Sequence, residues 1–165
     1  ESSSGISDRI VEPYYFKPSI NAIVAFDLDR NSNREFKINR FHKIEIIDKK
    51  WKNESKHLAN PKTDIFHIME SENQKGTKIV LEFDNYVKNL LFEEFPDAKR
   101  LEESPKSGER IFLVDKETGK WRLETTVFSY AGITRFYLGL AHRITIVEGD
   151  QLKEHIRKYI SSINV

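Results

Sequence analysis

The sequence contains no cysteine, a single methionine and only seven glycines among its 165 residues. Without cysteine there is no disulfide, no thiolate metal ligand and no cysteine nucleophile. No apolar run approaches the ~18 residues that a membrane-spanning helix needs, and we see no signal peptide. Apolar residues make up 38% of the chain and charged residues 32%, which predicts a packed core with a well-solvated surface.

Sequence signatures of catalysis are missing as well. The chain has no GxGxxG, no P-loop and no Gly-x-Ser-x-Gly, and its five histidines never fall into a metal-binding spacing. Ser129 has no sequence-local base to activate it. Asp27 and Asp29 could hold a cation, but turn chemistry alone explains two carboxylates at this place. We therefore expect neither an enzyme nor a bound cofactor or metal.

Charge is unevenly spread along a chain whose formal net charge is only +1. Residues 30–56 contain nine Lys or Arg against four Asp or Glu, a local charge of +5, whereas residues 61–165 hold sixteen cations and seventeen acids. A local basic region in a near-neutral chain fits a site-sized anionic ligand better than a long nucleic-acid track. The alternative is a solvated basic face without a ligand.

The first third of the sequence shows strand signals separated by short turns. Four strands are predicted, at residues 9–16, 20–28, 34–41 and 42–48. Pro13 interrupts the first and favours an edge position or a bulge. Short strands with tight turns and no helix predict a small, strongly bent antiparallel barrel over residues 1–55.

The rest of the chain divides into a linker and a mixed α/β domain. Residues 56–75 are polar except for one short apolar run at 65–69, which predicts a linker that partly packs against the rest of the chain. Residues 76–165 then predict strands at 77–83, 110–114, 121–128 and 143–147, and helices at 85–95, 130–141 and 150–163. Asp84 is placed to cap the first helix, and Pro96 to stop it. This order contains the split β-α-β of a ferredoxin-like sandwich plus a last helix, so we expect an α+β chain.

The last predicted helix is strongly amphipathic. Its apolar residues recur at helical spacing, and we expect all of them to face the core: Leu152, Ile156, Tyr159, Ile160 and Ile163.

Several short motifs together resemble the WYL domain of bacterial transcriptional regulators. The matching residues are Arg9, Pro13-Tyr14, Val24-Ala25-Phe26-Asp27, and Arg34, Phe36, Lys37, Ile38 and Arg40. The end of the chain, with "LKEHIRKYI" at 152–160 as its closing helix, resembles the WCX extension that follows WYL domains. The triplet that names the family is replaced here by Asn21-Ala22-Ile23, so its Trp and Tyr are missing.

The resemblance implies an Sm-type or SH3-like barrel, incomplete at its start, followed by a ferredoxin-like domain. It implies a cytoplasmic sensor that binds a nucleic acid or nucleotide-like ligand through a basic groove and relays this to a DNA-binding helix-turn-helix domain. The family's first strand and that DNA-binding domain would both lie before residue 1, so we expect the chain to be a piece of a longer protein.

Six residues are candidates for ligand contact: Arg9, Tyr14, Arg34, Lys37, Arg40 and His42. Arg40 is the expected phosphate anchor, because a guanidinium matches a phosphate bidentately. Arg34 shares its parity and would line the same strand face, whereas Lys37 would point to the opposite one. His42 flanks Arg40, and Tyr14 either stacks on a base or fills the barrel.

A different class of function also fits the sequence. The second domain's sheet or its last helix would mediate homodimerisation, and the basic strand would be only a solvated face. Native mass and ligand-binding measurements distinguish this interaction module from the sensor.

Overall fold

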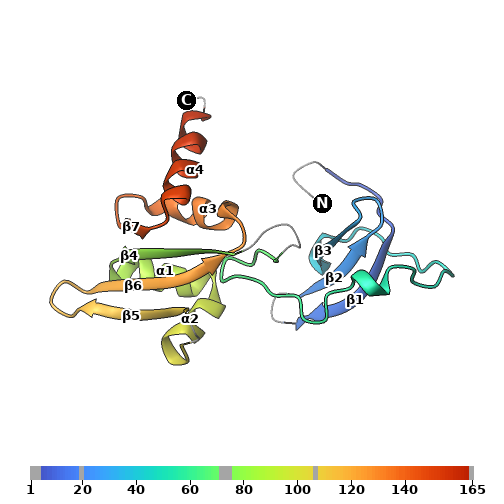
Figure 1. Ribbon diagram of the computed structural model, residues 1–165, viewed down its shortest axis with the longest axis horizontal. Coiled ribbons are helices and arrows are strands. Elements are labelled where there is room, and N and C mark those ends of the chain that lie inside the picture. The colour runs from blue at the N-terminus through green and yellow to red at the C-terminus, as the bar shows by residue number, and fades with distance from the viewer. Residues whose placement is uncertain (1–4, 19–20, 71–75, 106–107, 164–165) are drawn as a thin grey trace. The chain divides into compact units, whose positions relative to one another are not determined.

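The computed structural model describes residues 5–18, 21–70, 76–105 and 108–163 (Figure 1). The chain separates into two compact units, residues 1–61 (unit 1) and residues 62–165 (unit 2). The described residues form an α+β structure with one three-stranded and one four-stranded antiparallel sheet.

Unit 1 is built on a meander of three strands in the order β1-β2-β3. These are β1 (Val11–Lys17), β2 (Ala22–Asp27) and β3 (Ser32–Lys37). The central strand β2 is almost entirely buried, since its run of small and apolar residues can pack on both faces. Pro13 lies on the edge strand β1, and the register with β2 shifts directly after it, as expected of a residue without a backbone N–H.

The predicted third and fourth strands differ from the structure. β3 ends at Lys37, and Ile38–Arg40 form a short 3₁₀ helix instead of continuing the strand. Residues 42–48 lie outside any strand, and the side chain of Ile46 is 98% exposed. Alternating residues make a segment competent to form a strand, but a strand also needs a neighbour to bond and a face to cover. Within the described residues the sheet of unit 1 is therefore open rather than closed into a barrel.

Unit 2 contains a sheet in the order β5-β6-β4-β7 and four helices within its described residues. Its elements are β4 (Thr77–Phe83), α1 (Asn85–Glu94), α2 (Pro96–Glu103), β5 (Arg110–Asp115), β6 (Lys120–Val127), α3 (Tyr130–Leu140), β7 (Ile144–Glu148) and α4 (Asp150–Ser161). Asp84 caps α1 as predicted, accepting a hydrogen bond from Val87 N. Pro96 does end α1, but it also opens the unpredicted helix α2 at a position where its missing N–H costs nothing.

The core of unit 2 joins alternate residues of the sheet to all four helices. Leu81 on β4 lies opposite Leu123 on β6, and both are buried at the centre of the cluster. Ile65 and Phe66 belong to the same core, so part of the segment predicted as a linker packs within unit 2. Gly132 on α3 lets Phe66 approach closely, because a Cβ added there would lie 2.6 Å from the Phe66 Cβ.

Asp64 fixes this packed segment to the end of β6. Its buried carboxylate accepts hydrogen bonds from Phe66 N (3.0 Å) and Ile68 N (2.9 Å) on one oxygen, and from Phe128 N (2.9 Å) on the other. Burial raises the pKa of the Asp64 carboxyl, and the three backbone donors oppose that rise. One side chain thus holds a turn and ties it to the sheet.

Candidate functional site

The basic segment predicted from the sequence lies at the surface of unit 1. Between residues 30 and 56 the exposed cations are Arg30, Arg34, Arg40, Lys43, Lys49, Lys50, Lys52 and Lys56, and the exposed acids are Glu45, Asp48 and Glu54. Lys43 pairs with Glu45 at 2.5 Å. The surface of this segment therefore keeps the positive excess of its sequence, which favours contact with an anion.

Two of the candidate arginines converge on one buried carboxylate. Asp27 ends β2 with a fully buried side chain, and its Oδ2 lies 2.7 Å from Arg9 Nη1 and 4.0 Å from Arg34 Nη1. Strand register explains the meeting, since Arg34 pairs with Ala25, two residues before Asp27 on the same face of the sheet. We call Arg9, Asp27 and Arg34 the arginine–aspartate cluster.

The other oxygen of Asp27 holds the turn that follows β2. Oδ1 accepts hydrogen bonds from the backbone N–H groups of Asp29 (3.0 Å) and Arg30 (3.1 Å). The turn role predicted for Asp27 is thus present, and the ion pair with Arg9 adds to it. The sequence reading missed this second role. In the sheet Val11 of β1 pairs with Asp27, and Arg9 lies two residues before Val11.

The arginine–aspartate cluster carries two positive charges against one negative charge. The side chain of Arg9 is 20% exposed and that of Arg34 is 44% exposed, so both reach solvent. A guanidinium has five N–H donors, and Asp27 occupies only some of them. An anchored arginine loses little side-chain freedom when it binds an anion, so the cluster is suited to hold a phosphate or carboxylate.

The other basic candidates lie elsewhere on unit 1. Arg34 and Arg40 do not share one strand face, because the chain turns into the 3₁₀ helix after Lys37. The prediction of that pair is wrong for this physical reason. Lys37 pairs with Ala22 in regular register and has parity opposite to Arg34, as expected. Arg40 and His42 are both exposed, beyond the end of β3.

Tyr14 lies on the other side of the sheet from Arg34. Its hydroxyl donates to Asn33 Oδ1 at 2.9 Å, and Asn33 is next to Arg34 on β3, so the two side chains point to opposite faces. The ring of Tyr14 stacks on the imidazole of His57, with centroids 4.3 Å apart. One ring face is thus already covered from within unit 1. Of the six candidates, Arg9 and Arg34 meet at the carboxylate of Asp27, whereas Tyr14 lies on the opposite face of the sheet from Arg34.

Glu12 on β1 is a second buried acid, and it holds the loop at residues 51–57. Glu12 accepts hydrogen bonds from Lys52 N (2.8 Å) and from the backbone and side-chain nitrogens of Asn53 (both 3.1 Å). His57 Nε2 lies 3.2 Å from the same carboxylate, and Trp51 makes an edge contact with the His57 ring. Sequence patterning gave no sign of this anchor, because its partners lie about forty residues along the chain.

The Glu12 anchor is expected to fail in acid. Burial by itself raises the pKa of Glu12, but the hydrogen bonds from Lys52 and Asn53 outweigh it, so the pKa lies below its usual 4.5. A carboxyl group whose pKa is lower in the folded state than in the unfolded state stabilises the fold at any pH above its unfolded-state pKa. That stability is lost as the pH falls through the folded-state pKa. We expect Trp51 fluorescence to change in that acid range in a Trp121→Phe background. In Glu12→Gln the same transition should be absent; a transition identical to the parent's would exclude Glu12 as the titrating group.

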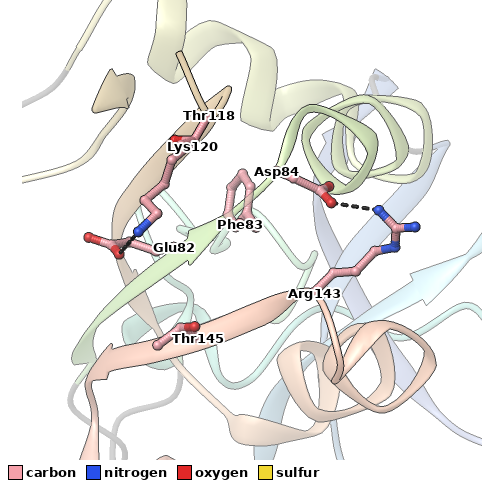
Figure 2. A pocket seen from close by; sticks show the side chains of 7 residues that line it. All are labelled: Glu82, Phe83, Asp84, Thr118, Lys120, Arg143 and Thr145. Atoms are coloured by element: carbon pink, nitrogen blue, oxygen red, sulfur yellow. Dashed lines mark hydrogen bonds and ion pairs between the residues drawn. The ribbon is translucent and has the colours of Figure 1, made fainter. Parts of the chain in front are cut away.

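Unit 2 has a shallow hollow of about 190 Å³ at one end of its sheet (Figure 2). It is lined by Glu82, Phe83, Asp84, Thr118, Lys120, Arg143 and Thr145. Lys120 pairs with Glu82 at 3.7 Å, and Arg143 pairs with Asp84 at 2.6 Å. The hydrogen bond from Arg122 lowers the pKa of Glu82, and that from Val87 N lowers the pKa of Asp84. The charges of the hollow balance in these ion pairs, which suit structural stabilisation.

The described residues contain neither a metal-ligand cluster nor a membrane-spanning helix. No group of three or more His, Cys, Asp or Glu side chains in those residues is placed to hold a metal ion. None of the helices described is long and apolar enough to cross a lipid bilayer.

Comparison with known proteins gives little beyond this geometry. No protein-family model matches the sequence, and none of the curated proteins matches it. Among solved structures, the chain is similar to the proteasome accessory factor B/C (PafBC) of Arthrobacter aurescens, with 16% sequence identity and a TM-score of 0.35. The match covers 90% of this chain and 21% of that chain.

Proposed function

We propose that this chain is the ligand-sensing region of a bacterial transcriptional regulator. Unit 1 binds a nucleic acid or nucleotide-like anion through the arginine–aspartate cluster, and no covalent chemistry follows. The observation that carries the proposal is the convergence of Arg9 and Arg34 on the buried carboxylate of Asp27. The sequence resemblance to WYL domains supports it, because Arg9, Asp27 and Arg34 are all among the matching residues.

The fold assignments that accompany this proposal are an Sm-like unit 1 and a ferredoxin-like unit 2. The strand order β5-β6-β4-β7 supports the second assignment, since the first and third strands of the unit are neighbours in its sheet. Helix α2 is an addition to that arrangement. The open meander of three antiparallel strands with a buried centre fits one part of such a barrel.

The regulatory step of the proposal is a shift between two arrangements of the regulator. A ligand can shift such an equilibrium only by its difference in affinity for the two states. A ligand-bound cluster would favour one orientation of a DNA-binding domain that lies outside these 165 residues. The regulator would act in the cytoplasm, where its DNA is.

Binding of a labelled single-stranded oligonucleotide, measured by fluorescence anisotropy at low salt, tests the proposal. We expect Arg34→Ala to weaken binding about tenfold, because one charge-assisted contact is lost. The slope of log Kd against log salt concentration should fall by about one released counterion. Arg40→Ala separates the cluster from the anchor predicted at residue 40. Arg100→Ala is the matched control, since Arg100 is an exposed arginine of α2 with a carboxylate partner, Asp97, at 3.2 Å.

Two results would contradict the proposal. One is that oligonucleotides, nucleotides and inorganic phosphate all fail to bind the parent chain at low salt. The other is that Arg34→Ala and Arg40→Ala both bind as tightly as Arg100→Ala. If Arg40→Ala weakens binding and Arg34→Ala does not, the binding site lies at the 3₁₀ helix and not at the arginine–aspartate cluster.

A further inference from the structure

Helix α4 carries an apolar stripe of which only the first half is covered. At 100° per residue, the apolar side chains of this helix, Leu152, Ile156, Tyr159 and Ile160, fall within one sector about 100° wide. Leu152 and Ile156 are buried in the core of unit 2. Tyr159 and Ile160 continue the same stripe, but they are 49% and 51% exposed, and Ile163, just past the end of the helix, is 49% exposed. The expectation that all five face the core is wrong, because the helix extends beyond the body of unit 2 (Figure 1).

A complementary hollow lies between α1 and α3 of the same unit. This apolar groove has a volume of about 430 Å³ and is lined by Leu90, Glu94, Arg135, Phe136, Gly139 and Leu140. Its floor is apolar, and Arg135 pairs with Glu94 at 2.6 Å across its rim. Gly139 leaves the groove open, because a Cβ built there would meet no atom within 4 Å.

The charges beside the stripe and the groove are complementary. The outer half of α4, residues 156–161, carries Arg157 and Lys158 and no acidic residue, and Lys158 pairs with Glu154 at 3.3 Å. The last turn of α1 has no basic residue and ends in Glu93 and Glu94, at the negative end of the helix dipole. A cation supplied from outside would stabilise that helix end. Arg157 and Glu93 are both exposed and suited to this contact.

We propose that the apolar groove receives the outer half of α4 from a second copy of this chain. The inner half of α4 is held on its own unit by Leu152 and Ile156, and Tyr130 donates to Gln151 at 3.1 Å. A continuous helix held in this way cannot bend its last turn back into the groove between α1 and α3 of its own unit. If each copy gives its stripe and receives its partner's, the two contacts form a closed two-fold dimer. The inference does not rest on the proposed ligand function.

Sedimentation and light scattering over about a hundredfold range of protein concentration test the dimer. We expect the parent chain to be a concentration-dependent dimer, and Ile160→Asp to weaken it at least tenfold by placing a charge in the apolar contact. Ile46→Asp is the matched control, because Ile46 is an exposed isoleucine of unit 1. It should dimerise like the parent.

Gly139→Leu separates loss of the contact from loss of folding. It fills the apolar groove with a side chain that finds open space there, and it replaces glycine inside a helix, so unit 2 should keep or gain thermal stability. We expect this stable variant to be at least tenfold weaker as a dimer. A parent chain that stays monomeric throughout the range, or a Gly139→Leu chain that dimerises like the parent, overturns the proposal.

A charge exchange tests the orientation of the helix in the groove. Arg157→Glu and Glu93→Arg should each weaken the dimer about two- to fivefold, since both charges lie at a solvated rim. The double variant should recover most of the parent affinity, because the pair is restored with reversed signs. Additive losses in the double variant would overturn this pairing.

Discussion

Replacing Asp27 with alanine is expected to lower the free energy of unfolding of unit 1 by about 3 kcal/mol. The substitution removes the fully buried partner of Arg9 and leaves that largely buried guanidinium without its counter-charge. It also takes the acceptor from the N–H groups of Asp29 and Arg30, which open the turn between β2 and β3. Asp27→Asn keeps that acceptor and loses only the charge, so its effect should be smaller.

Urea unfolding followed by tryptophan fluorescence measures this effect for unit 1 alone. The chain has two tryptophans, Trp51 in unit 1 and Trp121 in unit 2, so a Trp121→Phe background reports unit 1. Asp29→Ala is the control, because it changes an exposed aspartate in the same turn. If Asp27→Ala unfolds at the same urea concentration as Asp29→Ala, the cluster does not contribute to the stability of unit 1.

Asp64→Ala should destabilise unit 2 by a similar amount, about 3 kcal/mol, because it leaves three backbone N–H groups without their hydrogen-bond acceptor. One of the three, Phe128 N, links the segment at 62–70 to the end of β6. Asp64→Asn retains one acceptor oxygen for Phe66 N and Ile68 N but none for Phe128 N. Since burial already raises the pKa of Asp64, the neutral amide should be tolerated better than alanine.

The measurement for Asp64 uses the other tryptophan. In a Trp51→Phe background, Trp121 on β6 reports the unfolding of unit 2. Glu117→Ala, a change of an exposed acid in the turn between β5 and β6, gives the size of an ordinary surface effect. A loss no larger than that of Glu117→Ala would mean that water replaces the carboxylate as acceptor for these N–H groups.

Local sequence pattern predicted the elements of this fold where burial is one-sided and the partner is near. β6 alternates cleanly, and Asp84 marks the start of α1. Pattern failed where the outcome depended on a partner element. Residues 42–48 alternate like a strand yet lie in none, and the outer half of α4 is amphipathic yet half exposed. Amphipathicity indicates which face of an element is apolar and would gain from burial. It does not indicate whether another element covers that face.

The candidate site was predictable in part. Motif similarity selected Arg9 and Arg34, which the structure brings together on Asp27. The parity argument that joined Arg34 to Arg40 assumed one unbroken strand, and the 3₁₀ turn after Lys37 removes that assumption. Tyr14 was selected for its ring, but its position on the opposite face follows only from the sheet register and its bond to Asn33. The Glu12 anchor depends on contacts far apart in sequence, which periodicity cannot detect.

The exposed isoleucines at 44, 46 and 47 have a consequence for the colloidal behaviour of the protein. An extended apolar segment at the surface is a template on which other chains can stack as cross-β strands. Lys43 precedes this segment, and Asp48, Lys49 and Lys50 follow it, so charge brackets the apolar stretch on both sides. Such flanking residues act as gatekeepers that oppose aggregation by repulsion between chains. Salt screens that repulsion, so the same lysines that make the surface basic also make solubility depend on ionic strength.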